Sequence, residues 1–411
     1  MKARIFDDAL LRELAAKHGT PLYVYDAATI VERARELQAT RAFDVVRYAQ
    51  KAGPNLGILR VLRDHGVLVD AVSAGELHRA LAVEYSPREV QFCADLFDRD
   101  ALALLAEHEF EVNLGSPDML EQFARLGRGR RVTLRINPGF GHGHGSKVHT
   151  GGEASKHGIW HADLPAVARR AEEIGLAVVG LHMHIGSGSD LDNLARVGDA
   201  LLDCARAVRG SLETISCGGG LPIPYRAREP RFDVARFAAH WAATRERVDQ
   251  LVGRRVRLEI EPGRYLVAEA GVLLCEVRGR KKSGGTDYVL VDAGFNNLIR
   301  PAFYGAYHEI SIVGRDAEPC APRVVAGPLC ESADVFTQGP GGVLEPRPLP
   351  DAKIGDVMCI HDAGAYAACM ASNYNSRTLA AEVLVENGAP RVVRARQTYA
   401  DLLRAEVDPP Q

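Results

Sequence analysis

Short apolar runs that end in polar or glycine-rich corners recur at nearly constant spacing along the first third of this chain. Five such corners lie at Lys51, Ser73, Asp95, Gly115 and Asn137, each 20 to 22 residues after the one before. One strand, one helix and two short loops fill about that length. The spacing therefore predicts repeated strand–helix units.

Three later apolar runs continue the series, at 178–184, 213–217 and 257–261. Eight such units predict a TIM-type α/β barrel of eight parallel strands, whose functional residues lie at the carboxyl ends of the strands. The alternative is an open doubly wound sheet. That alternative is disfavoured because no Gly-x-Gly-x-x-Gly sequence follows the first strand. We expect the barrel to span residues 26–265.

After residue 265 the pattern changes to strands separated by turns, at 272–278, 287–292, 323–326 and 356–360. Little helical periodicity lies between them, which predicts a mostly antiparallel β domain over 266–411. Residues 21–26 also read as a strand. We expect residues 1–25 to contribute to this second domain.

Composition excludes several classes of protein. The chain has 411 residues, more than one barrel usually needs, and its formal net charge of −3 gives no basic surface for nucleic acid. No apolar stretch reaches membrane-spanning length, and the first residues lack the apolar core of a signal peptide. The eight cysteines are scattered without a Cys-x-x-Cys pair, which is typical of reduced thiols and predicts a cytoplasmic protein.

Two strand ends carry residues suited to a carbonyl cofactor. Lys51 is placed to form a Schiff base, although a lone lysine there could also be a solvated strand end. Glu261 could keep a pyridine nitrogen protonated, and Gly263 allows the backbone to approach a phosphate closely.

Two more strand ends carry phosphate-binding or ring-stacking candidates. Gly218, Gly219 and Gly220 expose consecutive backbone N–H groups that can cradle a phosphate, unless they form a simple flexible loop. His182 and His184 share one face of their strand, where an imidazole can stack on a planar ring or, alternatively, bind a metal. The Gly- and His-rich tract 139–152 also resembles a metal site, but we expect a mobile loop there and no metal.

The complete set of motifs resembles the pyridoxal-phosphate decarboxylases of the alanine-racemase-like barrel type, and most of all the diaminopimelate decarboxylase family. The matching segments occur in the family's order over nearly the whole chain, at 48–52, 184–188, 218–220, 261–264, 300–304, 330–332 and 363–366. Segments 139–144 and 155–160 resemble one bacterial subgroup of that family.

The resemblance implies a role for each matching residue. Three would be catalytic: Lys51, His184 and Cys330, the last delivering a proton to Cα. Those expected to bind pyridoxal 5′-phosphate are Lys51, His184, Ser187, Gly219, Gly220, Glu261, Gly263, Arg264 and Tyr366. Those expected to bind substrate are Arg264, Arg300, Tyr304, Glu331 and Tyr366.

The implied reaction converts meso-2,6-diaminopimelate to L-lysine, the last step of bacterial lysine biosynthesis, in a homodimer with shared active sites. Arginines at the distal pocket suit a carboxylate, and Glu331 suits an ammonium. Alternatives are a decarboxylase of the ornithine, lysine or arginine type, one acting on a carrier-bound amino acid, or a catalytically silent regulator that binds the cofactor. Alanine racemases use a tyrosine opposite their lysine, and no such motif lies near Cys330.

Overall fold

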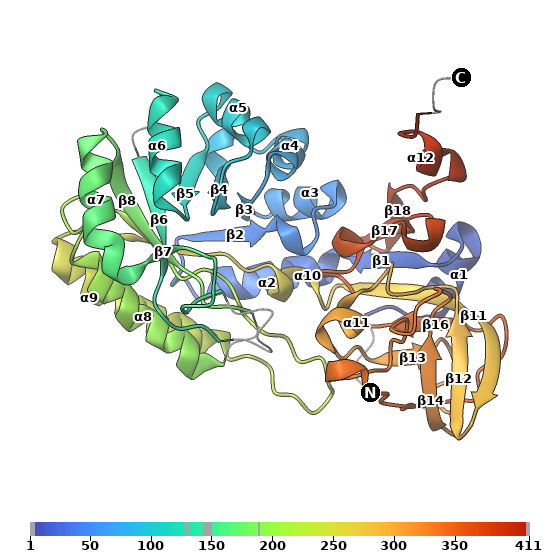
Figure 1. Ribbon diagram of the computed structural model, residues 1–411. Coiled ribbons are helices and arrows are strands. Elements are labelled where there is room, and N and C mark those ends of the chain that lie inside the picture. The colour runs from blue at the N-terminus through green and yellow to red at the C-terminus, as the bar shows by residue number, and fades with distance from the viewer. Residues whose placement is uncertain (1–4, 128–130, 143–149, 188–189, 408–411) are drawn as a thin grey trace. The chain divides into compact units, whose positions relative to one another are not determined.

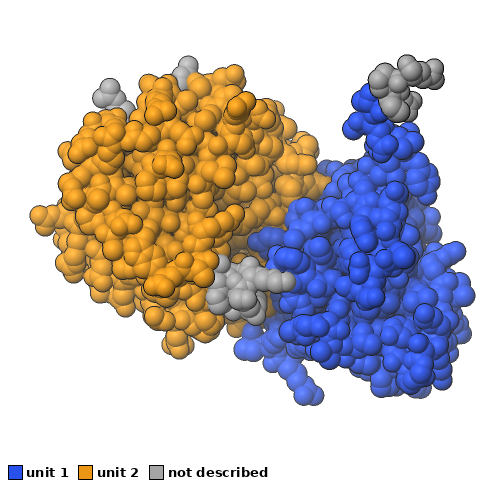
Figure 2. All heavy atoms as spheres, viewed as in Figure 1, with its two compact units in different colours: residues 1–30, 224–230, 267–411 blue, residues 31–223, 231–266 orange. Residues whose placement is uncertain are grey.

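The computed structural model describes residues 5–127, 131–142, 150–187 and 190–407. The chain forms two compact units, coloured separately in Figure 2. One comprises residues 31–223 and 231–266, and the other comprises 1–30, 224–230 and 267–411. The expected barrel, 26–265, includes residues 224–230, but this short segment belongs to the second unit. Its Tyr225 packs on His308 there.

Within the described residues, eight parallel strands of the first unit close into a barrel (Figure 1). The order runs β5-β4-β3-β2-β10-β9-β8-β6, and the pairing of β5 with β6 completes the ring. This confirms the predicted TIM-type barrel. The strands are β2 (Val45–Ala49), β3 (Leu68–Ala71), β4 (Val90–Ala94), β5 (Glu111–Leu114), β6 (Arg131–Asn137), β8 (Ala177–Met183), β9 (Thr214–Ser216) and β10 (Arg257–Ile260), with the short β7 (Ile159–Trp160) beside β6.

Helices follow the barrel strands, and several start at a polar residue just after a strand. Ser73 caps α4 by accepting from the backbone N–H of Glu76, and Asn55 caps α3 in the same way. Such caps satisfy N–H groups that a helix start leaves unpaired. The helices are α2 (Ala27–Ala39), α3 (Leu56–Asp64), α4 (Ala74–Ala82), α5 (Arg99–Glu107), α6 (Pro117–Arg125), α7 (Leu164–Glu173), α8 (Leu191–Ala205), α9 (Val234–Val252) and α10 (Arg264–Val267).

Charged side chains fill part of the barrel interior. The Arg47 side chain is fully buried, donates from Nε to Oε2 of Glu259 at 2.8 Å and also pairs with Glu111. Arg257 approaches Oε1 of Glu259 at 2.7 Å. Because a buried charge is costly unless it is paired, these groups depend on one another.

The second unit is built on a mixed, mostly antiparallel sheet, as predicted. Its central strand is β11, which pairs antiparallel with β1, and β1 pairs in turn parallel with β17. The elements are α1 (Asp8–His18), β1 (Leu22–Asp26), β11 (Gly271–Ser283), β12 (Thr286–Val291), α11 (Arg300–Tyr304), β13 (Ile310–Ile312), β14 (Ala321–Ala326), β15 (Arg347–Leu349), β16 (Val357–Ile360), β17 (Ala381–Glu386), β18 (Ala389–Arg394) and α12 (Tyr399–Leu403).

The hairpin of β17 and β18 is absent from the strands predicted above, although its turn carries a clear signal. Asn387 and Gly388 are the two loop residues, and both have positive φ, 51° and 76°. Asn-Gly between alternating apolar residues is the usual sequence for such a two-residue turn.

Buried residues of α1, β1, β11 and β17 form a hydrophobic core in this unit. It includes Leu11, Leu14, Val24, Leu274 and Val383. In the described part of the chain no helix is both long and apolar enough to cross a membrane.

Candidate active site

Four carboxyl strand ends of the barrel carry the residues predicted to bind the cofactor. Lys51 lies in the 3₁₀ turn directly after β2, with an exposed side chain. His184 follows β8, the glycine triplet follows β9, and Glu261 follows β10. Because the barrel is closed and parallel, these ends lie at one face of the first unit.

The glycines pack so closely on their neighbours that no side chain would fit. A Cβ on Gly219 would lie 2.3 Å from the carbonyl oxygen of Glu261. A Cβ on Gly220 would lie 2.3 Å from the carbonyl oxygen of Gly186 and 3.3 Å from Cε1 of His184. Gly220 also has a φ of +98°, which favours glycine. The glycine loop is therefore locked against both neighbouring strand ends rather than flexible.

Gly263 lets the loop after the eighth barrel strand pack closely on the segment that carries Lys51. A Cβ there would lie 3.1 Å from Cβ of Ala52 and 3.2 Å from the carbonyl oxygen of Ala49, on either side of Lys51. Ala49 also donates its backbone N–H to the carbonyl of Pro262 at 3.1 Å. The lysine loop and the Glu261 loop thus form one packed layer.

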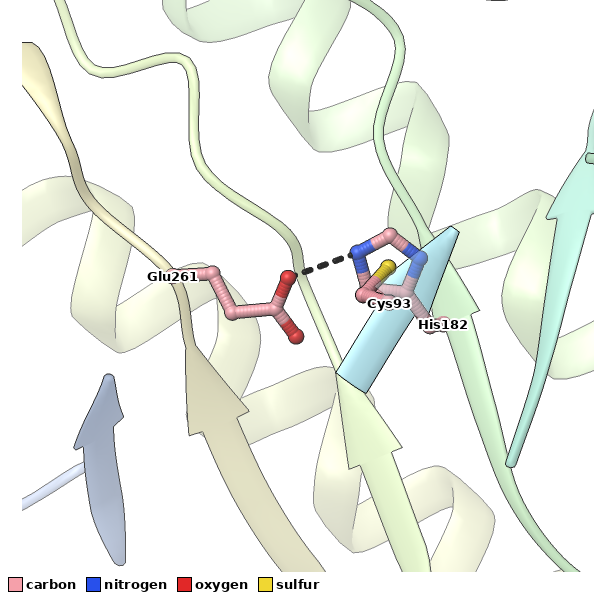
Figure 3. Close-up of side chains that lie close together, drawn as sticks. All are labelled: Cys93, His182 and Glu261. Carbon is pink, nitrogen blue, oxygen red and sulfur yellow. Dashed lines mark ion pairs between the residues drawn. The ribbon is translucent and has the colours of Figure 1, made fainter. Parts of the chain in front are cut away.

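Glu261 is buried and ionised. Ser216 donates its hydroxyl to Oε1 at 2.7 Å, and Nε2 of His182 lies 2.9 Å from Oε2 (Figure 3). Burial by itself raises the pKa of Glu261, but His182, the Ser216 hydroxyl and Arg47 outweigh it and lower the pKa to about 2. A fixed carboxylate of this kind suits a protonated ring nitrogen.

Cys93, His182 and Glu261 also form a compact cluster, with candidate metal-ligand atoms within 4.8 Å of one another (Figure 3). Burial, followed by the charge of Asp70, raises the pKa of the Cys93 thiol well above its usual value. A metal ligand must be the thiolate, so a protonated Cys93 disfavours a metal. The cluster is better suited to orienting Glu261.

Two further groups surround the lysine. Burial, and after it the charges of Lys51 and Arg135, lowers the pKa of His184 well below its usual value, which leaves a neutral ring able to stack. Burial and the charge of Glu261 raise the pKa of Asp70 well above its usual value. Nδ1 of His184 and Oδ1 of Asp70 have no hydrogen-bond partner among the described residues.

These observations fit a flat cofactor with a phosphate. The set offers an exposed lysine, a neutral ring, an ionised carboxylate and a backbone cradle. Asp70, Ser216 and Arg135 also belong to the site, although no sequence motif assigned them to it. Asp70 lies near the carboxyl end of the second barrel strand, β3, and that position was the available signal.

The stem of the Gly- and His-rich tract is anchored beside His184. Thr150 donates its hydroxyl to the carbonyl of His184 at 2.8 Å. The side-chain amide of Asn137 donates to the carbonyl of Gly152 and accepts from the backbone N–H of the same residue. Residues 143–149, in the interior of the tract, lie outside the described residues, and the mobile loop expected there falls on them. Ser187 lies in the bend after β8.

The second unit holds the remaining predicted residues. Cys330 is exposed, and its backbone N–H donates to Oδ1 of Asn375 at 2.8 Å. The buried carboxylate of Asp334 fixes the preceding loop by accepting from Leu329 at 2.8 Å and Phe295 at 2.7 Å. Cys330 is thus an accessible thiol on a fixed loop, not a small core residue.

Arg300 opens α11 and is almost fully buried, while Tyr304 at the end of that helix is half-buried. Tyr366 has a φ of +56°, unusual for a tyrosine, and stands on a turn whose Gly364 packs on the carbonyl of Val267. Glu331 is exposed and accepts from the Tyr374 hydroxyl at 3.4 Å, while Arg264 is buried in the first unit.

Comparisons with known proteins agree with this arrangement. Residues 27–268 match the family described as pyridoxal-dependent decarboxylase, pyridoxal binding domain. Diaminopimelate decarboxylase of Escherichia coli K12 is 49% identical over 406 residues, which cover 97% of this chain and 96% of that protein. The enzyme of Streptomyces coelicolor is 50% identical, covering 98% of this chain and 93% of its own.

Solved structures show the same likeness. A crystal structure of diaminopimelate decarboxylase superimposes with a TM-score of 0.94 at 48% identity, covering 98% of this chain and 99% of its own. The enzyme of Helicobacter pylori complexed with L-lysine gives 0.88 at 30% identity, with 96% and 99% covered. The chain therefore belongs to the diaminopimelate decarboxylase family of pyridoxal-dependent decarboxylases.

Proposed function

We propose that this protein decarboxylates meso-2,6-diaminopimelate to L-lysine with pyridoxal 5′-phosphate as its cofactor, the last step of bacterial lysine biosynthesis. The observation that carries the proposal is the exposed Lys51 at a barrel strand end, in one packed layer with an ionised, buried Glu261. The high identity to relatives named for this activity supports the choice of substrate.

Residues of the barrel, together with Tyr366 of the second unit, would hold the cofactor. When bound, pyridoxal phosphate accepts the electron pair left behind as carbon dioxide departs. Lys51 would hold the cofactor covalently, Glu261 would keep its ring nitrogen protonated, and the neutral ring of His184 would stack on it. The phosphate would be surrounded by Ser187, Gly219, Gly220, Gly263, Arg264 and Tyr366.

Most of the residues that would act on the substrate belong to the second unit, and Arg264 of the first unit would join them. The accessible thiol of Cys330 would deliver a proton to Cα after decarboxylation. Arg264, Arg300 and Tyr304 would bind the distal carboxylate, assisted by Tyr366, and Glu331 would bind the distal ammonium. Arginine suits a carboxylate because its planar fork donates two parallel hydrogen bonds.

Apart from Arg264 and Tyr366, which serve both the cofactor and the substrate, the two sets belong to different units, and we include in the proposal a homodimer whose active sites are shared between subunits. Two-fold symmetry would create two equivalent sites of this kind. A cytoplasmic location is also proposed. None of the eight cysteines, all within the described residues, forms a disulfide, in keeping with a reducing compartment.

The direct test is an assay of the purified protein with pyridoxal phosphate. With meso-diaminopimelate we expect equimolar carbon dioxide and L-lysine, while ornithine, lysine and arginine, which lack a distal carboxylate, should react far more slowly. Lys51→Ala protein serves as the matched blank. Faster turnover of ornithine or lysine than of diaminopimelate would overturn the proposal, and cofactor binding without turnover of any amino acid would favour a silent regulator.

A further inference from the structure

The second unit contains a buried histidine, His308, to which the proposed reaction gives no role. It lies just before β13 and is 2% exposed. We infer that His308 is a positioning residue that aims the guanidinium of Arg300 at the distal carboxylate of the substrate. This inference rests on the proposed function, because that function assigns Arg300 to the carboxylate.

The contact between the two side chains fixes the protonation of the histidine. Nη1 of Arg300 lies 2.7 Å from Nε2 of His308. A guanidinium can only donate, so Nε2 must accept and cannot carry a proton. Nδ1 of His308 lies 2.8 Å from the carbonyl oxygen of His361, which can only accept, so Nδ1 must carry the proton. His308 is therefore a neutral ring in one defined tautomer.

The sheet holds this imidazole in place. β13 and β16 pair antiparallel with Ile310 opposite Ile360, and the backbone N–H of His361 extends the pairing by donating to the carbonyl of Glu309 at 2.9 Å. The carbonyl that accepts the hydrogen bond from His308 thus belongs to a residue at the end of an ordered ladder. The orientation of Nε2 follows from the register of two strands.

A tyrosine ring contacts the same guanidinium. Cζ of Arg300 lies 4.8 Å from the ring centroid of Tyr225, within the range of a cation–π contact. The rings of Tyr225 and His308 meet nearly edge to face, at 5.5 Å and 72°. Tyr225 is held in turn, because its backbone N–H donates to Glu229 at 2.7 Å. The guanidinium of Arg300 therefore donates a hydrogen bond to His308 and packs on the ring of Tyr225, which orients its plane.

Such support affects substrate choice more than chemistry. A residue remote from the reacting carbon that binds substrate and transition state equally changes KM and leaves kcat nearly unchanged. Decarboxylation removes the carboxylate of the reacting carbon, so the product L-lysine retains the distal carboxylate. A misaimed Arg300 should therefore weaken the binding of both diaminopimelate and L-lysine, while the binding of 1,5-diaminopentane, which has no carboxylate, stays the same.

The experiment compares four full-length holoenzyme variants with the wild type. His308→Leu removes the acceptor, His308→Gln restores an acceptor at the reach of Nε2, and Arg300→Met removes the clamp itself. His18→Leu, a half-buried histidine of α1 in the same unit, controls for losing a histidine. For each variant we measure KM and kcat for diaminopimelate, the inhibition constants of L-lysine and of 1,5-diaminopentane, and the dissociation constant of pyridoxal phosphate.

We expect His308→Leu to raise KM roughly tenfold, the lower range for a hydrogen bond to a charged group, with kcat within about twofold. His308→Gln should recover most of the loss. The inhibition constant of L-lysine should rise in step with KM, and the constants for 1,5-diaminopentane and pyridoxal phosphate should stay at wild-type values. If Arg300→Met raises KM but His308→Leu does not, this inference is wrong while the proposed function stands. If Arg300→Met leaves KM unchanged, the assignment of Arg300 in the proposed function fails instead.

A folding defect in His308→Leu would not end the test. His308→Asn keeps a polar side chain but reaches only the position of Nδ1, so it cannot accept from Arg300. A raised KM in His308→Asn together with a normal KM in His308→Gln would support the inference. Equal KM values in the two would overturn it.

Discussion

The two units of this protein position their functional residues by different means. In the barrel, Lys51, His184 and Glu261 lie where regular strands end, and close glycine packing locks those ends together. In the second unit, Cys330 lies on a loop and Arg300 at the start of the short helix α11, and single side chains such as Asp334 and His308 hold them. Position is set by repeated backbone geometry in the first case and by individual hydrogen bonds in the second.

This difference matches the work proposed for each set. A covalently held cofactor needs fixed anchors, and strand ends on a closed barrel provide them. Substrate recognition varies among enzymes that share a cofactor, and loop residues can change without disturbing a sheet. Substitutions in the barrel set should therefore affect cofactor binding, and substitutions in the second set should affect what happens to the substrate.

The largest effect should come from Lys51→Ala. Without the amine, the cofactor cannot be held covalently, so turnover and the visible absorption of the bound cofactor should both be lost. Treatment with borohydride followed by mass spectrometry measures covalent attachment. A variant that still fixes one cofactor per chain under borohydride would show that another lysine is the anchor.

Cys330→Ala should slow the reaction of the substrate without weakening the binding of the cofactor. A positioned proton donor is worth roughly 10²–10⁴ in rate, so L-lysine formation should slow by that factor. Cofactor affinity, measured by absorbance titration, should stay at the wild-type value because Cys330 belongs to the second set. Near-normal turnover would return Cys330 to a purely structural role.

Arg47→Met tests the charged interior of the barrel. Removing the arginine leaves the buried Glu259 with only the partly exposed Arg257 beside it, which should lower the free energy of unfolding by about 3 kcal/mol, the lower end for a broken buried pair. Arg131→Met is the matched control, because the Arg131–Glu213 pair is exposed and should contribute only about 0–1 kcal/mol. Urea unfolding measures the free energy of unfolding of both variants. Equal losses would mean that burial does not determine how much each ion pair contributes to stability.

Gly220→Ala tests the locked glycine loop. The added methyl would meet the carbonyl of Gly186, and overpacking of this kind costs about 1–3 kcal/mol. The dissociation constant of pyridoxal phosphate should rise correspondingly. Gly388→Ala also has a positive φ but meets nothing within 4 Å, so it should leave cofactor affinity unchanged. Unchanged affinity in Gly220→Ala would mean that the loop is not the phosphate cradle.

Mixing the two inactive variants tests whether one active site uses both sets from different subunits. If Lys51→Ala and Cys330→Ala proteins are unfolded together and refolded, half of the dimers should be mixed, and one site in each mixed dimer should carry neither change. Activity should return to about a quarter of the wild-type value under two-fold symmetry. Verified mixed dimers without recovered activity would place both residues of a site in one subunit.

The barrel could be predicted well from the sequence because its signal is repeated. Strand spacing and polar corners alone are enough to locate Lys51, His184 and Glu261 at strand ends. The second unit was predicted less completely, because β13 and β15 have three residues each, too few to show a pattern. Asp70 and His308 could not be assigned from sequence, since the raised pKa of the one carboxyl and the fixed tautomer of the other ring depend on tertiary neighbours.

The place of β1 in the second sheet has a consequence for synthesis on the ribosome. This strand is made first, yet both of its neighbours, β11 and β17, come more than two hundred residues later. The barrel can fold while the N-terminal strand waits with two unsatisfied edges, and exposed edges of this kind invite aggregation. The last strands to emerge therefore decide whether the first one finds its partner, and a chain truncated before residue 381 should leave a folded barrel joined to an incomplete sheet.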